Sequence, residues 1–184
     1  MADVELTAAA ARPGQDESLV RRAAAGDRDA FAVLIAPRVD RSLRTARAIL
    51  GSDAEAHDAA QDALVSAWVN LPRLRDPSRF DAWLNRMLIN GCREMLRRRR
   101  RSREVQVEVD IPVGDFAGGS LETASVKAAF GRLSVDERSI LLLHHLHGQP
   151  LEQLARHLGV PIGTAKSRLW HARRSLERAL EAEA

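Results

Sequence analysis

Cysteine and long apolar runs are nearly or wholly missing from this sequence, and each absence excludes a class of protein. The 184 residues contain one cysteine, Cys92, so the chain can form no internal disulfide and no cysteine cluster for a metal. No stretch approaches the roughly 18 apolar residues that a membrane-spanning helix needs. Asp3 and Glu5 stand where a signal peptide has basic residues. We therefore expect a cytoplasmic protein without membrane insertion.

Motifs of the common enzyme classes are missing too. The sequence has no glycine-rich phosphate-binding loop and no nucleophile motif. The six histidines, among them His144, His145 and His147, have no cysteine or carboxylate partners at metal-site spacing. The sequence therefore predicts no catalytic residue, no metal site and no cofactor.

The composition that remains favours helix. Alanine and arginine are frequent, tyrosine is absent and β-branched runs are rare, which together favour helix over strand. The net charge is only +3, so the local placement of the arginines matters more than their sum. We expect an all-α protein.

Apolar residues spaced three and four apart predict a first helical domain over residues 16–101. Residues 1–15 lack this pattern and end in a Pro-Gly breaker pair, so we expect a disordered leader there. Trp68 and Trp83 fall on apolar stripes and are interpreted as core residues. The helix that follows Asp27 is expected to bury Phe31, Leu34, Ile35, Val39, Leu43, Ala46 and Leu50.

The helix that starts near Phe80 has a basic stripe opposite its apolar one. The members of the basic stripe repeat at helical spacing, and the stripe runs into an arginine block at 97–101. The stripe consists of Arg86, Asn90, Arg93 and Arg97. Like charges at this spacing repel one another unless a polyanion neutralises them. We predict contact with nucleic-acid phosphates. The alternative is a solvated helix end, where cations are favoured by the helix dipole.

The helical period stops over 102–119, where valines alternate with acids and the segment ends in glycines, which predicts an extended linker. A second helical domain is expected over 120–184, with a capping box at Ser134 and Glu137. Its last two helices are joined by a turn at Gly159 and have the spacing of a helix-turn-helix. The predicted fold is thus two small helical domains joined by a linker.

The second helix of a helix-turn-helix lies in the major groove of DNA. With Ala165 and Leu169 inward, its other faces present small, hydroxyl-bearing and cationic side chains, which suit base and phosphate contacts. The predicted contacts are Gly163, Thr164, Lys166, Ser167, Arg168, His171 and Arg174. Trp170 also lies outward, where it either packs against the preceding helices or contacts DNA. A helix pair with a solvated charged face remains the alternative.

Four motifs in this order resemble the extracytoplasmic-function (ECF) sigma factors of the sigma-70 family. They are GDRDAF at 26–31, AHDAAQDALVSAW at 56–68, FDAWLNRMLINGCREMLRRRRR at 80–101 and LEQLARHLGVPIGTAKSRLWHARRSL at 151–176. The resemblance covers nearly the whole chain after residue 16. It implies a sigma factor that binds core RNA polymerase and directs promoter recognition, promoter opening and transcription initiation.

The resemblance also implies roles for residues. Asp58, Gln61 and Asp62 match the face that docks on the polymerase clamp helices. The helix-turn-helix matches the module that reads the minus-thirty-five element and rests on the polymerase flap. The loop and helix that capture an unstacked base of the minus-ten element correspond to Arg73, Arg75, Arg79, Arg86, Asn90, Arg93 and Arg97. An anti-sigma factor is implied as a further partner.

The sequence departs from the family pattern at two positions, and two other classes of protein are alternatives. Trp170-His171 stands where members often have His-Arg, and Asp62 where Glu is commoner. A helix-turn-helix regulator that binds DNA without core polymerase would explain the C-terminal half but not the arginine stripe. A helical nuclease would need clustered carboxylates, whereas those of this sequence are dispersed.

Overall fold

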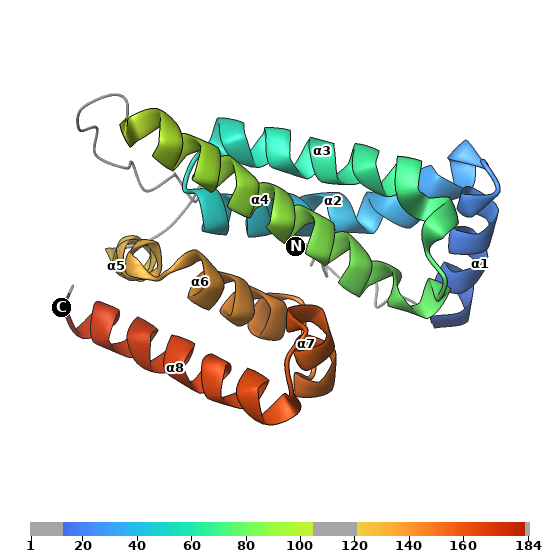
Figure 1. The fold of residues 1–184 in the computed structure, drawn as a ribbon. Coiled ribbons are helices and arrows are strands. Elements are labelled where there is room, and N and C mark those ends of the chain that lie inside the picture. Colours follow the sequence, from blue (N-terminus) through green and yellow to red (C-terminus); the bar gives the residue numbers. More distant parts are fainter. Residues whose placement is uncertain (1–12, 105–120, 183–184) are drawn as a thin grey trace, which may run out of the picture.

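The computed structural model describes residues 13–104 and 121–182, and every regular element in these two ranges is helical. Helices α1 to α4 form one group and α5 to α8 a second group beside it (Figure 1). The predicted all-α fold is confirmed. Most of the expected leader (1–12) and linker (105–119) lies outside the described residues. The elements are α1 (Pro13–Ala24), α2 (Arg28–Leu50), α3 (Asp53–Asn70), η1 (Leu71–Arg73), η2 (Pro77–Arg79), α4 (Phe80–Glu104), α5 (Leu121–Arg132), α6 (Val135–Leu141), η3 (Leu142–Leu146), α7 (Leu151–Leu158) and α8 (Ile162–Glu181).

Two helices extend beyond the predicted limits. α1 begins at Pro13 rather than Asp16, because proline is favoured in the first turn of a helix, where its missing N–H is not needed. α4 continues past Arg101 to Glu104, since arginine and glutamate are strong helix formers. Pro-Gly at 13–14 therefore starts a helix, whereas the sequence analysis interpreted it as a breaker.

In the first group, α3 and α4 pack along α2, and α1 covers one end of these three helices (Figure 1). Leu34, Leu71 and Phe80 are among the apolar residues buried at that end. The rings of Trp68 and Phe31 meet edge-on, 5.0 Å apart. Trp83 packs against the same cluster, so both tryptophans have apolar neighbours, as predicted.

The buried side of α2 contains an arginine that the apolar pattern missed. Arg38 is only 6% exposed, whereas Val39, which was predicted to point inward, is 39% exposed. The guanidinium of Arg38 is neutralised by Asp16 and Asp81, two carboxylates from other helices. A buried charge is tolerated when it is paired and hydrogen-bonded.

In the second group, α7 and α8 form the predicted helix-turn-helix. Gly159 ends α7 with a φ of 65°, a left-handed conformation that glycine adopts without steric cost. Ala165, Leu169 and Ala172 are the buried residues of α8. The Ser134 capping box at the start of α6 is confirmed, with both of its reciprocal hydrogen bonds present.

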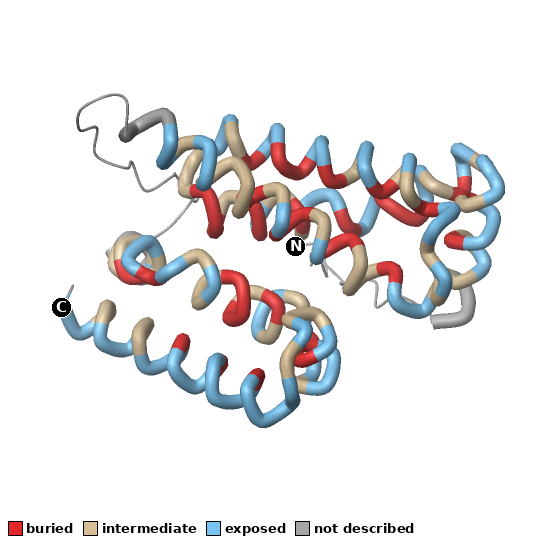
Figure 2. Tube along the Cα trace, viewed as in Figure 1, coloured by how far each residue is buried: buried red, intermediate tan, exposed pale blue. Residues whose placement is uncertain are grey.

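The two groups pack against each other. Leu88 of α4 and Ile140 of α6 belong to one shared apolar cluster, which is part of the buried interior in Figure 2. Polar contacts add to it: Arg138 Nη1 donates to the carbonyl oxygen of Ile49 at 2.5 Å, and His147 Nε2 lies 2.7 Å from Thr45 Oγ1. One side of α2 and α4 therefore faces the second group. Within the described ranges, no helix is long and apolar enough to span a membrane.

Candidate nucleic-acid interface

The outer face of α8 is open to solvent. All seven residues predicted to contact DNA are exposed there: Gly163, Thr164, Lys166, Ser167, Arg168, His171 and Arg174. The first turn of α8 has no acidic residue, and no side chain caps its free N–H groups. The positive end of the helix dipole and these N–H groups suit a phosphate.

The basic stripe of α4 is open only in part. Arg86, Asn90 and Arg97 are exposed. Arg93 instead forms an ion pair with Asp136 of α6, at 2.8 Å. The stripe borders a cleft of about 950 Å³, and Arg168 and His171 of α8 line the same cleft. Residues predicted to contact two separate DNA elements thus share one cleft in this structure.

Two histidines are partly buried where the groups meet. Burial, with Arg86 and Arg93 nearby, lowers the pKa of His157 to about 4. Burial, with Arg41 nearby, lowers the pKa of His147 to about 4. Both imidazoles are therefore neutral at pH 7.

The loop between α3 and α4 presents three exposed arginines, Arg73, Arg75 and Arg79. The loop is ordered by Asp76, which accepts hydrogen bonds from the Ser78 hydroxyl (2.6 Å) and the Ser78 backbone N–H (3.1 Å). These bonds and Arg79 lower the pKa of the Asp76 carboxyl. A cavity of about 490 Å³ opens beside the loop. Its lining includes Leu74, Asp81, Trp83 and Arg86, with Arg156 and His157 of α7 on the other side.

The outer face of α3 differs in charge from the two basic faces. Asp58, Gln61 and Asp62 are all exposed on it, as predicted. None of them has a hydrogen bond or ion pair among those that the structure shows within the described residues. This acidic and amide-bearing face is free for a partner with complementary cationic groups.

The comparisons with known proteins agree with this arrangement. Residues 34–102 match the model of Sigma-70 region 2, and residues 123–176 match that of Sigma-70 region 4. The ECF RNA polymerase sigma factor SigM of Mycobacterium tuberculosis is 35% identical over 166 residues, which are 90% of this chain and 84% of SigM. The chain belongs to the ECF sigma factors. The function of this sigma factor is to direct transcription initiation, and the alternative of a regulator that acts without polymerase is not favoured.

Solved structures show the same fold. CnrH, solved in complex with the cytosolic domain of CnrY, is 29% identical with a TM-score of 0.72, and the match covers 92% of this sigma factor and 99% of CnrH. RpoE, solved with the anti-sigma factor NepR from Bartonella quintana, is 28% identical with a TM-score of 0.69. That match covers 83% of this sigma factor and 96% of RpoE. Sigma factors are in general DNA-recognition proteins rather than enzymes.

The structure adds two residues of α3 that the sequence-based predictions did not include. Val65 (56% exposed) and Val69 (66% exposed) continue the face of Asp58 and Asp62 along α3, at successive helical spacings of four, three and four. This pattern could have been detected in the sequence, where two valines follow two acids on one helix face. A valine at an exposed helix position gains nothing from packing within the chain, so its presence there is a signal. In this sigma factor the α3 face is thus half acidic and half apolar.

The structure excludes one of the two alternatives for Trp170. Its side chain is 56% exposed, so it does not pack into the preceding helices of the sigma factor. The Arg174 guanidinium lies 5.8 Å from the centre of its ring, in a cation–π contact. An apolar ring and a cation therefore stand side by side on the outer face of α8.

Among the described residues of the sigma factor, no three histidine, cysteine, aspartate or glutamate side chains are placed to hold a metal ion. Burial raises the pKa of the Cys92 thiol to about 12, so this thiol stays protonated and unreactive at neutral pH.

Proposed function

We propose that this sigma factor recognises promoters through two cationic helix faces, one on each helical group. α8 reads the minus-thirty-five element, with Lys166 and Ser167 at base edges and Arg174 on phosphate. The observation that supports this most strongly is the outer face of α8, on which every predicted contact is exposed in a helix-turn-helix. Trp170 adds an apolar contact for a thymine methyl group.

The first group opens and holds the minus-ten element. Arg86, Asn90 and Arg97 contact the phosphates of the separated strand, and Arg93 joins them once it is released from Asp136. The cavity beside the loop of Arg73, Arg75 and Arg79 receives an unstacked base. Flipping a base costs a few kcal/mol, so contacts inside such a cavity must offset that cost.

The face of α3 binds core RNA polymerase. Asp58, Gln61 and Asp62 contact cationic and polar groups of the clamp helices, while Val65 and Val69 supply the apolar part of the interface. Charged pairs at an interface mainly set partner choice and association rate, and buried apolar groups supply affinity. The second group rests on the polymerase flap.

Further features of the proposal come from the relatives. CnrH and RpoE were each solved with a binding partner, so we infer that an anti-sigma factor also binds this chain. We infer a cytoplasmic location and no catalytic activity of its own. We place the first functional domain at 13–104 and the start of the second at α5, joined by the segment between them.

Run-off transcription with purified core polymerase tests the proposal. The chain plus core should yield discrete transcripts from a library of start-site fragments, and the core alone should not. Replacement of Asp58, Gln61 and Asp62 by alanine should weaken core binding, whereas the same replacement of Asp29, Asp40 and Glu152, which are exposed on other faces, should not. Tight binding to promoter fragments without core, and no transcripts with it, would favour the regulator instead.

A further inference from the structure

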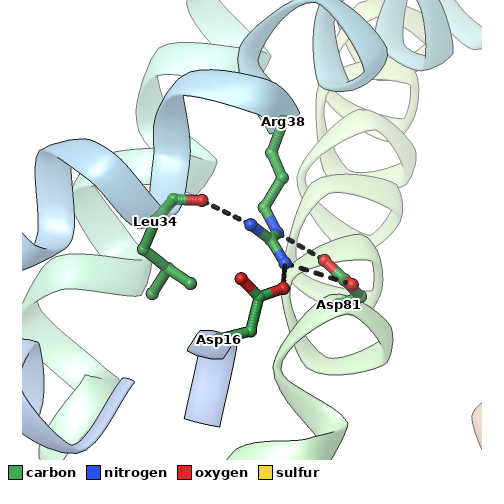
Figure 3. Close-up of polar contacts among 4 residues, drawn as sticks. All are labelled: Asp16, Leu34, Arg38 and Asp81. Atoms are coloured by element: carbon green, nitrogen blue, oxygen red, sulfur yellow. Dashed lines mark hydrogen bonds and ion pairs between the residues drawn. The ribbon is translucent and has the colours of Figure 1, made fainter. Parts of the chain in front are cut away.

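The buried ion cluster around Arg38 joins three helices of the first group (Figure 3). Arg38 Nε donates to Asp81 Oδ1 at 2.5 Å, and Nη2 donates to Asp16 Oδ2 at 2.6 Å and to Asp81 Oδ2 at 3.3 Å. Nη1 donates to the carbonyl oxygen of Leu34 at 2.5 Å. Asp16 lies on α1, Arg38 on α2 and Asp81 in the first turn of α4, so one guanidinium fixes all three elements.

Stability alone is a weak reason for this cluster. The desolvation of a buried ion pair offsets much of its attraction, and apolar residues of similar volume are often as stable. What an arginine adds is direction, because its planar fork fixes the position and orientation of a carboxylate. The ring of Phe80, 5.4 Å from the guanidinium carbon, limits its position further.

The cluster lies directly behind the proposed minus-ten site. The turn Pro77–Arg79 immediately precedes Phe80 and Asp81, and it packs against α1. Asp81 also lines the cavity of about 490 Å³ beside the loop. Its side chain is 50% exposed, so one carboxylate meets both the buried guanidinium and the cavity. A displacement at Arg38 would therefore move the loop and the cavity wall together.

We propose that Arg38 is a positioning residue for promoter opening. It contacts no DNA, and it acts by holding Asp81 and the turn Pro77–Arg79 in the geometry that receives the unstacked base. This inference rests on the proposed role of the loop in the minus-ten element. It makes α1, through Asp16, part of the promoter-opening apparatus.

The test compares a fully paired promoter with the same promoter pre-opened over the minus-ten element. The variants are Arg38→Lys, which keeps the charge but loses the fork, Arg38→Met and Asp16→Asn, with Arg44→Met as the matched control at an exposed arginine of the same helix. At saturating holoenzyme, we expect both Arg38 variants to lower transcription from the paired promoter about tenfold, since part of a contact that offsets base flipping is lost. Transcription from the pre-opened promoter should stay within about twofold of wild type, because the flipping cost is already met. Asp16→Asn should have an intermediate effect.

Core-polymerase affinity and the melting temperature are measured on the same proteins. A purely structural role would lower core affinity and transcription from both templates together, and that result would overturn the proposal. Unchanged transcription from the paired promoter in both Arg38 variants would overturn it as well. If wild-type protein failed to transcribe either template, the proposed function would itself be wrong, which distinguishes that failure from failure of the positioning role.

Discussion

α4 and α8 each have a cationic stripe on one side and a buried apolar stripe on the other, but the surroundings of the two cationic stripes differ. The seven predicted contacts of α8 are all exposed, and only two of them, Arg168 and His171, also line the cleft beside α4. The stripe of α4 borders a cleft that the second group partly closes, and Arg93 is already paired with Asp136. A periodic run of cations thus predicts a basic helix face, whereas only the tertiary structure shows whether that face is free.

The difference also separates two kinds of DNA contact. Small and hydroxyl-bearing residues on α8, such as Gly163 and Ser167, suit close approach to base edges. The α4 stripe consists of arginines and one asparagine beside a cavity, which suits phosphates and an unstacked base. We therefore expect changes in α4 to affect promoter opening and changes in α8 to affect sequence preference.

The largest effect is expected from the α4 stripe. Arg86→Ala combined with Arg97→Ala should lower initiation about a hundredfold, because two charge-assisted contacts to phosphate are lost. The matched control is Arg28→Ala with Arg44→Ala, two exposed arginines of α2. Run-off transcription at several salt concentrations measures both pairs. Equal losses in the two pairs would show that total charge, not the α4 stripe, is responsible.

The next effect is expected from acidification, which should weaken the packing of the two helical groups against each other. The pKa values of His147 and His157 are about 4 in the folded chain, below the ordinary value of 6.5. Their stabilising contribution is therefore complete above pH 6.5 and is lost as the pH falls toward 4. Each of the two histidines should lower the free energy of unfolding by about 2 kcal/mol by pH 5.

Urea unfolding between pH 7.5 and 4.5 measures this drop. His157 faces Arg86 and Arg93, and His147 faces Arg41, Arg44 and Asp81. Replacement of both histidines by glutamine should remove most of the pH dependence. If the double variant lost as much stability on acidification as wild type, other groups would be the cause.

A smaller effect, on sequence preference, is expected at α8. Lys166→Ala or Ser167→Ala should change the preferred bases at single positions of the minus-thirty-five element by about tenfold. Arg174→Ala should instead weaken binding to all sequences and lower the salt slope by about one. Binding of holoenzyme to a randomised element measures all three. Uniform losses for every variant would contradict the base-reading roles.

The smallest effect concerns the ion pair between the groups. Asp136 has an exposed side chain, so Asp136→Arg should repel Arg93 without unfolding α6. Release of Arg93 from this ion pair should raise the affinity of the sigma factor for single-stranded DNA a few-fold. The gain is small because surface ion pairs contribute roughly 0–1 kcal/mol. Glu181→Arg, at the far end of α8, makes the same charge change away from α4 (Figure 1). A similar gain in this control would mean that charge alone raises the affinity.

Local patterns predicted most of the fold. The capping box at Ser134, the turn at Gly159 and the inward face of α8 depend on residues within a few positions of one another. Such features are encoded locally, so one sequence suffices to find them. The family resemblance, rather than spacing, indicated the acidic face of α3, on which Asp58 and Asp62 are exposed.

Contacts between distant residues could not be predicted. Arg38 is buried in place of Val39 because Asp16 and Asp81 neutralise its charge. These two partners lie 22 and 43 positions away in the sequence, so no local pattern could indicate them. The pairing of Arg93 with Asp136 likewise joins residues 43 positions apart, across the two groups. The period of α2 placed this side of the helix inside the protein, but nothing local indicated which side chain could be neutralised there.

The central claim is that α4 and α8 contact separate promoter elements, and directed DNA cleavage tests it most directly. An iron chelate is attached after Arg98→Cys on α4 or Glu177→Cys on α8, both exposed positions, while the buried native thiol of Cys92 stays unlabelled. In holoenzyme on a promoter, the α4 probe should cut near the minus-ten element and the α8 probe near the minus-thirty-five element, roughly 25 base pairs or two and a half turns apart. Cleavage of one shared stretch by both probes, or of neither element, would contradict the account.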